Sequence, residues 1–427
     1  MKALIHASLF DFDTYRQDCY LLFDDRIQSV GPMADFPGAQ EVFDCSGGVV
    51  MPGLLAGHTH IYSTFSRGWN TLFAPHNFTE ILEQLWWKLD AGLDREAVYA
   101  SGLVSGAEFI KNGVTTVIDH HASGTDIKGT LELLKRAVCD ESGLRGIFCF
   151  ETSDRFPLEQ CVEENVEFAS ASSKKYAGLF GMHASMTLSD SSLAYIAEHS
   201  ADLPIHIHVA ESGEDARDCR SCYGKSIVQR LDSFGLLRSG SLLAHCNHIE
   251  AEDFPLIRER GATIAVNPTS NMNNGVDLPD APEFLKQGIP CILGNDGLGF
   301  NMAREMLNLV YTMHHRAQSP TAFSFGELRQ MLRFGYGYAG NLLNCRLGRL
   351  ESGYEADFLF HPYNPPTPMD ESNIWGHFFY GMLDAFRPKD VWCGGQLRMT
   401  DYVPAVSESA IARNAQSVSK KLWERIS

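Results

Sequence analysis

The stretch Met51-Pro52-Gly53-Leu54-Leu55-Ala56-Gly57-His58-Thr59-His60 decides the fold predicted for this chain. It predicts an apolar strand, broken once at Pro52-Gly53, that ends in a His-x-His pair. Alternate residues of an extended strand point to the same side, so His58 and His60 project together. Two neutral imidazoles on one side form half of a site for zinc or another first-row transition metal. The motif is also common in proteins without a metal, so the prediction depends on finding the other ligands.

The composition is that of a folded, acidic protein. The chain has 427 residues, of which 44% are hydrophobic and 21% charged, enough for a large barrel plus an accessory domain. The formal net charge of −18 argues against nucleic acid or an anionic membrane as a partner. Because the first residues do not resemble a signal peptide and no segment offers about 18 uninterrupted apolar residues, we expect a cytoplasmic protein that does not enter a membrane. Eleven scattered cysteines, an odd number, do not predict a disulfide framework.

Seven further apolar stretches follow the first strand, with helical patterns between them. Near-continuous apolar strands that alternate with helices are typical of a parallel sheet. Eight such units predict an α/β fold, a (β/α)₈ TIM-type barrel over residues 49–345. A doubly wound open sheet is the alternative, and the lack of a glycine-rich phosphate turn after the first strand weighs against it. The further strands are predicted at 114–119, 145–151, 178–183, 204–209, 241–246, 262–267 and 289–294.

Both ends of the chain carry short β segments separated by turn residues. Residues 1–48 and 346–404 share this character, and a few short strands cannot bury much surface alone. We therefore expect the two terminal pieces to form one small β-sandwich domain together. Residues 405–427 are predicted to form a C-terminal helix, packed either on the barrel or on a neighbouring subunit.

Polar residues gather where the predicted barrel strands end. The active site of such a barrel lies at the carboxyl ends of its strands, so residues from distant parts of the chain should converge there. Half of the 16 histidines fall at these ends, which a random scatter would not produce. The strand-end residues are His58, His60, Asp119, His120, His121, His183, His206, His208, Glu211, His245, Asn267 and Asp296.

Four of these residues predict a catalytic metal site. His58, His60, His208 and Asp296 would supply three imidazoles and one carboxylate and leave room for a water molecule. His208 is preferred to His206 because it lies nearer the end of its strand, and His206 is expected to fill the barrel interior. We expect one divalent metal ion, Zn²⁺ in the first place, with Fe²⁺ or Mn²⁺ as alternatives that the ligand set does not separate.

Five motifs in this order resemble the amidohydrolase superfamily. They are PG-x₄-HTH, HVAE, AHC, NPTSN and NDG, which contain His60, Glu211, His245, Asn267 and Asp296 respectively. The match is to the aminohydrolase branch, which includes guanine, cytosine and adenosine-type deaminases and the triazine chlorohydrolases. Further stretches, among them residues 119–123, resemble a group of aminohydrolases called SsnA. The resemblance covers essentially the whole chain and implies a metal-dependent hydrolase.

The resemblance also implies roles for the strand-end residues. It makes His58, His60, His208 and Asp296 the metal ligands, and it implies a single ion because the fourth strand lacks the lysine of two-metal relatives. Three residues would be catalytic, and the chemistry of the residues agrees. Asp296 would accept the proton of the attacking water, Glu211 would protonate the ring nitrogen and the leaving amine, and His245 would stabilise the oxygen.

Aromatic and polar side chains near the site are the expected substrate contacts. Trp86 would stack on a flat heterocycle, with packing between barrel and lid as the alternative, and Arg67 would meet an anionic or carbonyl group. His121, His183 and Asn267 are further candidates. A side-by-side pair such as His120 and His121 points to opposite faces of a strand, so at most one of the two can enter the barrel.

The function predicted from these residues is hydrolysis of a C–N bond in a small nitrogen heterocycle. Hydrolytic deamination with release of ammonia is the first hypothesis. Hydrolytic opening of a cyclic amide or amidine ring is the alternative, because the same groups could perform either reaction. A non-catalytic metal-binding scaffold is disfavoured, since the positions of Glu211 and His245 are filled. We expect a homodimer, because barrels of this kind often pair.

Overall fold

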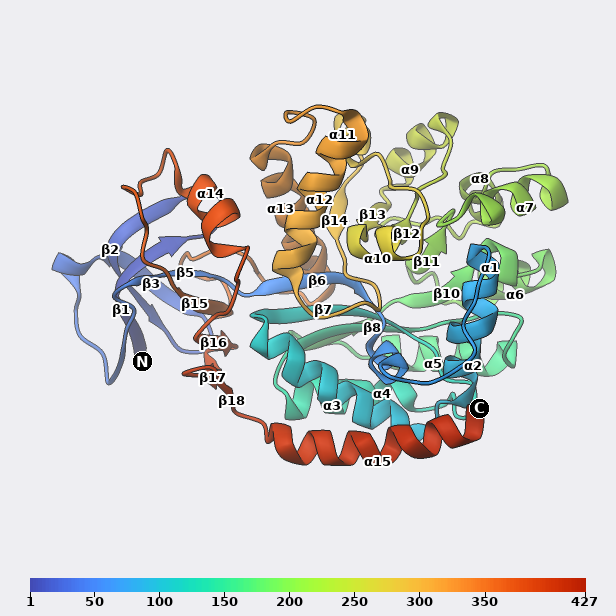
Figure 1. Ribbon diagram of the computed structural model, residues 1–427, viewed down its shortest axis with the longest axis horizontal. Helices are drawn as coiled ribbons and strands as arrows, with labels where there is room; N and C mark the ends of the chain where they lie inside the picture. Colours follow the sequence, from blue (N-terminus) through green and yellow to red (C-terminus); the bar gives the residue numbers. More distant parts are fainter.

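The computed structural model describes residues 1–427, which form a sheet-rich region beside a larger α/β region (Figure 1). In the α/β region, a four-stranded parallel sheet has the order β6-β7-β8-β9 and a five-stranded parallel sheet has the order β10-β11-β12-β13-β14. The strands are β6 (Leu54–Thr59), β7 (Val114–His121), β8 (Arg145–Phe150), β9 (Tyr176–Gly178), β10 (Phe180–Ala184), β11 (Ile205–Val209), β12 (Leu242–His245), β13 (Thr263–Val266) and β14 (Cys291–Leu293).

Backbone hydrogen bonds join the two parallel sheets at both edges. The amide of Thr152, just after β8, donates to the carbonyl of Gly181 in β10 at 3.0 Å. At the other edge, Thr59 at the end of β6 forms a parallel bridge with Asp296, just after β14. The amide of His60 also donates to the carbonyl of Asp296 at 3.2 Å. Residues 54–60 therefore lie next to the last strand of the other sheet.

Helices connect the parallel strands and cover them. Their apolar faces and the strands share one core of 93 buried residues. Polar side chains fix the starts of two of these helices, since Asp94 caps α3 and a capping box of Ser226 and Gln229 starts α8. The main helices are α3 (Arg95–Lys111), α4 (Thr130–Lys135), α5 (Leu158–Ala169), α6 (Asp190–His199), α7 (Gly213–Tyr223), α8 (Ile227–Ser233), α9 (Phe254–Arg260), α10 (Pro268–Asn273), α11 (Ala281–Lys286), α12 (Met302–Ala317) and α13 (Phe325–Leu342).

The two ends of the chain share one mixed sheet of nine strands, at the left of Figure 1. Its order is β18-β17-β16-β15-β5-β1-β2-β3, and β4 also pairs with β1. The strands are β1 (Lys2–Phe10), β2 (Tyr15–Phe23), β3 (Ile27–Pro32), β4 (Glu41–Asp44), β5 (Gly48–Pro52), β15 (Phe358–Pro362), β16 (Asp390–Cys393), β17 (Gln396–Thr400) and β18 (Val403–Pro404).

This terminal sheet is continuous, so the prediction of a sandwich of two sheets is wrong. The register of β1 against β2 shifts twice, between Leu4 and Leu9, and such irregularities bend a sheet. The bent sheet encloses its own core, in which Phe23 of β2 packs edge-on against Phe358 of β15 with ring centroids 5.0 Å apart. A single curled sheet thus buries 14 residues without a second sheet.

The chain passes from the terminal sheet to the parallel sheet at Gly53. β5 pairs with β1 and β15 in the terminal sheet, whereas β6 begins at Leu54 in the parallel sheet. The boundary predicted between residues 48 and 49 is therefore one strand too early. Pro52-Gly53 marks the change of sheet, and a Cβ atom at Gly53 would lie 2.3 Å from the side chain of Thr115.

The C-terminal helix α15 (Glu408–Ile426) runs along α3 at the bottom of Figure 1. Leu422 is fully buried, and the indole N–H of Trp423 donates to the carbonyl of Phe65 at 2.8 Å. The sequence left open whether this helix packs on the barrel or on a neighbouring subunit. In the structure it packs on the α/β region of its own chain. None of the helices combines the length and apolar character needed to cross a membrane.

Candidate active site

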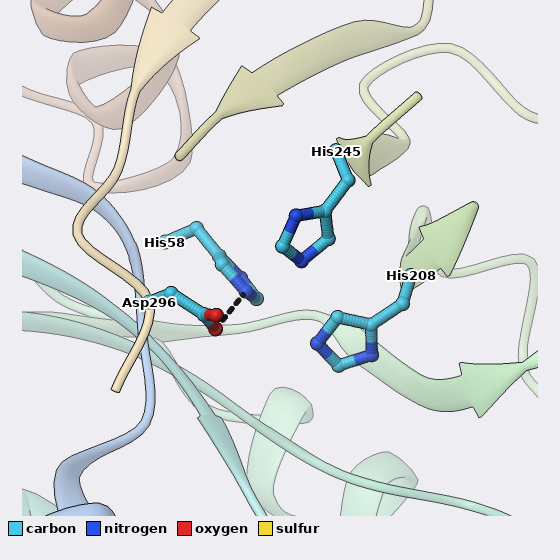
Figure 2. A group of neighbouring side chains, drawn as sticks. All are labelled: His58, His208, His245 and Asp296. Atoms are coloured by element: carbon cyan, nitrogen blue, oxygen red, sulfur yellow. Dashed lines mark ion pairs between the residues drawn. The ribbon is translucent and has the colours of Figure 1, made fainter. Parts of the chain in front are cut away.

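Nitrogen and oxygen donors from several strand ends lie close together, and Figure 2 shows four of the residues that supply them, His58, His208, His245 and Asp296. His58 lies in β6, His60 directly follows it, His208 lies in β11 and Asp296 follows β14. Asp296 Oδ1 is 3.2 Å from His58 Nε2 and 3.0 Å from His60 Nε2. His60 Nε2 is also 3.1 Å from His208 Nε2. The structure therefore brings together all four predicted metal ligands.

Each of the three imidazoles is held so that its Nε2 faces the other donors. His58 Nδ1 lies 2.8 Å from His206 Nε2, His60 Nδ1 lies 2.7 Å from the carbonyl oxygen of His120, and His208 Nδ1 lies 2.8 Å from the carbonyl oxygen of His183. A carbonyl oxygen only accepts, so Nδ1 carries a proton in both His60 and His208, and Nε2 is the atom of each ring that faces the other donors. Partners of this kind orient metal-binding histidines.

The donor set fits a divalent metal ion. Ligands bound at about 2.0–2.1 Å in a tetrahedron lie about 3.3 Å apart, close to the separations between these donors. His58 Nε2 is buried and has no hydrogen-bond partner, as expected of a ligand atom. Burial lowers the pKa of His58 to about 3, so this imidazole is neutral at pH 7.

Asp296 is the anionic member of the set. Burial opposes its ionisation, but the close imidazoles of His58 and His60 outweigh burial and hold the pKa of Asp296 well below its usual range. Its second oxygen accepts a hydrogen bond from the hydroxyl of Ser270 in α10. Asp296 has a φ of 53° and His245 a φ of 70°, a left-handed conformation that few non-glycine residues adopt and that clusters at functional sites.

Glu211 and His245 form an acid–base pair beside the donors. Glu211 Oε2 lies 3.4 Å from His245 Nε2, and His245 Nδ1 lies 2.8 Å from Asn271 Oδ1. Because that amide oxygen only accepts, His245 Nδ1 carries the proton and His245 Nε2 is free to face the site. Burial raises the pKa of Glu211 to about 7, with Asp296 adding to the rise and His245 opposing it.

A cavity opens over these groups. His60, His208, Glu211 and Asp296 line its floor, and aromatic and apolar side chains form much of its wall. The wall includes Phe78, Leu82, Trp86, Trp87, Met186 and Leu298. Two of the five predicted substrate contacts, Trp86 and His183, are among the lining residues. A flat ring could therefore reach Glu211 and Asp296 while it packs against aromatic side chains.

The other three predicted substrate contacts do not line the cavity. The chain after His60 forms a short helix, η2 (Ile61–Ser66), which carries Arg67 away to lie over the ring of Phe300 at 4.8 Å. His121 instead bonds Ser123 Oγ at 3.0 Å, because β7 continues through both histidines and turns His120, not His121, toward His60 and His208. Asn267 is fully buried at the start of α10, outside the cavity wall.

Several groups at the site escaped the sequence analysis. Glu151, directly after β8, lines the cavity together with Asp90, and Arg155 binds both carboxylates. Glu151 ends the third predicted strand, so the strand-end rule could have found it. Asp90 lies in the helix α2 (Trp87–Gly92) and follows no strand, so the strand-end rule does not reach it. Asn274 of the loop after α10 donates to Glu211 Oε1 at 3.4 Å, and its place just past the NPTSN motif was the available signal.

Comparison with known proteins shows the protein family to which this chain belongs. Residues 49–398 match the model of the amidohydrolase family, and the chain belongs to this family. It is 27% identical to a 5-methylthioadenosine/S-adenosylhomocysteine deaminase of Desulforudis audaxviator over 94% of each chain. It is also 27% identical to a 5′-deoxyadenosine deaminase of Methanosarcina mazei, over 97% of this chain and 96% of the relative.

A solved structure supports the fold. The adenosine deaminase from Xanthomonas campestris with bound zinc superimposes with a TM-score of 0.85 at 20% sequence identity. The match covers 99% of this chain and 98% of that protein. Parallel strands, connecting helices and the mixed terminal sheet are thus arranged as in an established member of the same fold.

Proposed function

We propose that this protein is a metal-dependent hydrolase that deaminates an amino-substituted nitrogen heterocycle and releases ammonia. The observation that carries the proposal is the position of Glu211. This buried carboxyl group lines the same cavity as the four donors and contacts His245, an arrangement that metal binding alone does not require. The names of the relatives, deaminases of adenine nucleosides, support the same chemistry.

The proposal includes the architecture that positions the site. The hydrogen bonds at both edges of the two parallel sheets support one closed (β/α)₈ barrel, made of β6–β8 and β10–β14 with their helices. The barrel extends from Leu54 to about residue 345, and the terminal sheet with α15 completes the chain. In this arrangement the donors stand at the carboxyl ends of the strands, where barrel enzymes carry their active sites.

His58, His60, His208 and Asp296 would hold one divalent metal ion, for which zinc is the first choice and iron or manganese the alternatives. The zinc in the Xanthomonas structure supports this choice. When bound, such an ion supplies the Lewis acidity that turns water into a nucleophile near neutral pH. His206 and the carbonyl groups of His120 and His183 keep the three imidazoles in position.

Two residues, Asp296 and Glu211, carry out the proton transfers of the reaction. Asp296 accepts a proton from the attacking water, whose oxygen bonds to the ring carbon that carries the amino group. Glu211, protonated at Oε2, donates to the adjacent ring nitrogen and so favours attack at that carbon. His245 stabilises the charge that develops on the oxygen. The ionised Glu211 then takes the proton of the new hydroxyl group and passes it to the amino group, the C–N bond breaks, and ammonia leaves while the oxygen stays on the ring as a carbonyl group. The proton held by Asp296 returns to Glu211 and restores both carboxyl groups.

An adenine-type base is the substrate class that we propose. Aromatic and apolar side chains of the cavity wall, among them Trp86 and Trp87, suit a flat ring. The activities printed in the names of the two relatives, on methylthioadenosine, S-adenosylhomocysteine and 5′-deoxyadenosine, agree with such a ring.

An assay of ammonia release tests the proposal. Zinc-loaded protein is incubated with 5′-deoxyadenosine, 5′-methylthioadenosine, adenosine, guanine and an aminotriazine, beside protein stripped of metal by a chelator. We expect ammonia from at least one of the adenine nucleosides, lost in the stripped protein and restored by zinc. Ammonia from none of these compounds, with metal content shown to be stoichiometric, would contradict the proposal.

A further inference from the structure

A chain of hydrogen bonds joins the two carboxyl groups assigned to proton transfer. Ser270 in α10 donates through Oγ to Asp296 Oδ2. Asn274, which caps the end of α10, donates through Nδ2 to Ser270 Oγ at 3.3 Å and to Glu211 Oε1 at 3.4 Å. The other oxygen of Asp296 faces the imidazoles of the donor set, and the other oxygen of Glu211 faces His245. The bridge of Ser270 and Asn274 therefore holds one oxygen of each carboxyl group and leaves the second one facing the site.

The two bridging residues lie on one face of a single helical turn. Ser270 and Asn274 are four residues apart, and the amide of Asn274 donates to the carbonyl of Ser270 at 2.8 Å. Asn271, in the same turn, accepts the hydrogen bond from His245 Nδ1. Residues 270–274 thus orient the proton acceptor, the proton donor and the imidazole that stabilises the oxygen.

Buried hydrogen bonds anchor this turn to the neighbouring helix α12. The amide of Thr269 donates to Glu305 Oε2 at 3.2 Å, and Asn308 Nδ2 donates to Thr269 Oγ1 at 2.8 Å. Glu305 and Ser270 are both buried. Catalytic groups must be held within about 0.5 Å of the productive geometry, and an anchored turn can supply that precision.

We propose, on the basis of the deaminase function, that Ser270 and Asn274 are positioning residues, which hold Asp296 and Glu211 at the separation that the proton transfers require. Both side chains are neutral, so they orient the carboxyl groups without adding a charge. Because Ser270 contacts a ligand of the metal ion, its hydroxyl group should also strengthen metal binding.

The variant Asn274→Leu tests the link to Glu211. Leucine has a similar size and makes none of the hydrogen bonds of asparagine. We expect kcat to fall about tenfold or more, because misplacement of a catalytic group by about 1 Å can cost 10²-fold, and KM to change less than about threefold. The matched control is Asn341→Leu on the exposed surface of α13, outside the cavity, which should leave both constants unchanged.

A double variant separates positioning from direct contact with the substrate, since Asn274 lines the cavity. If Asn274 acts through Glu211, Asn274→Leu should lower kcat less than about twofold in the Glu211→Gln background. The full loss in that background, or an effect mainly on KM, would mean that Asn274 contacts the substrate and would overturn its positioning role.

Competition with a zinc chelator tests Ser270 without a measurement of activity. Ser270→Ala removes the hydrogen bond to Asp296 and should weaken zinc binding about 10–100-fold, the usual cost of losing such a partner. Ser270→Thr keeps a hydroxyl group and should recover most of the affinity. Unchanged zinc affinity in Ser270→Ala would contradict the role of Ser270. If that variant does not fold, Ser270→Cys, with its weak thiol donor, takes its place.

The zinc measurement also separates this proposal from the proposed function. If no compound is deaminated, the deaminase function fails, whereas the zinc affinities of the Ser270 variants still show whether the bridge holds Asp296. If deamination is found and the variants of Ser270 and Asn274 match the wild type, the bridge fails and the deaminase function stands.

Discussion

Burial raises the pKa of the Glu211 carboxyl group, whereas the neighbouring imidazole of His245 lowers it. The effect of burial is the larger one, so the pKa of Glu211 rises to about 7. A carboxyl group with this pKa can hold a proton near neutral pH and still release it, as a general acid must. Glu211 lines the same cavity as His60, His208 and Asp296, so a ring bound there could receive its proton.

Glu211→Gln should remove this proton while keeping the shape of the side chain. We expect kcat to fall by about 10²–10⁴-fold, the usual contribution of a positioned general acid or base. Metal content, measured by mass spectrometry of the elements, should remain at one ion per chain. The matched control is Glu214→Gln, since Glu214 bonds Thr79 at the outer rim and should affect kcat less than threefold. Full activity in Glu211→Gln would contradict the role.

The pH dependence of kcat/KM follows from the same pKa. Glu211 is protonated below about pH 7 and ionised above it. Because the protonated form is the one that donates to the ring nitrogen, kcat/KM should fall as the pH rises through about 7. A profile that stays level to pH 9 would show that the acid is another group.

His206 tests how the ligands are held. It is buried beneath the donors and lies 2.8 Å from His58 Nδ1 by its Nε2 atom. Loss of such a partner typically weakens metal binding 10–100-fold, roughly what we expect for His206→Leu. His206→Gln retains an oxygen that can accept the hydrogen bond and should recover part of the affinity. Competition with a zinc chelator measures both, and unaltered affinity in His206→Leu would refute the positioning role.

The residues that sequence analysis placed correctly are those whose backbone position fixes their direction. His58, His60, His208 and Asp296 stand at strand ends, and the alternation of a strand sends them to one side. Arg67 was misplaced because a short helix, not a strand, follows His60. The sequence did not decide between His120 and His121, and His121, the expected substrate contact, lies outside the cavity because the pleat of β7 turns His120 toward His60 and His208.

At the scale of elements, eight strands and the long helices were predictable because their apolar patterns are continuous. The curl of the terminal sheet was not, since it depends on register shifts in β1 and on packing between strands more than 300 residues apart, such as β2 and β15. The transition at Gly53 was visible only as a break in one apolar run. Both β5 and β6 are almost entirely buried, so their composition does not show which sheet each strand joins.

A buried ion-pair network joins the two regions of the fold. Arg145 of β8 binds Asp357, just before β15, at 2.6 and 3.0 Å, and Glu355 at 3.1 Å. All three side chains are at most 5% exposed. This network ties the parallel sheet to the terminal sheet independently of the covalent link at Gly53.

Asp357→Asn should therefore destabilise the protein. Removal of one partner from a buried ion pair costs about 3–5 kcal/mol, because the remaining charge is left uncompensated. The lower end is expected here, since Glu355 still contacts Arg145. Asp232→Asn breaks a more exposed pair with Arg260 and should cost less than about 1 kcal/mol. Urea denaturation measures both, and equal losses would contradict the account of the network.

At the scale of the whole molecule, three expectations from the sequence stay predictions. The homodimer is tested by light scattering after gel filtration, where a dimer has twice the monomer mass of 47.4 kDa. The cytoplasmic location is tested by cell fractionation. The expected closeness to the SsnA group also stays a prediction, and neither it nor the assembly alters the chemistry proposed for the cavity.

The measurement that tests the central claim most directly is mass spectrometry of the product formed in ¹⁸O-labelled water. Zinc-loaded protein is incubated with the adenine nucleoside that releases ammonia fastest. Deamination predicts a product in which one labelled oxygen has replaced the amino group, with the ring intact and one ammonia released per turnover. A product that has gained a whole labelled water and released no ammonia would mean ring opening, and it would contradict the assignment of this protein as a deaminase.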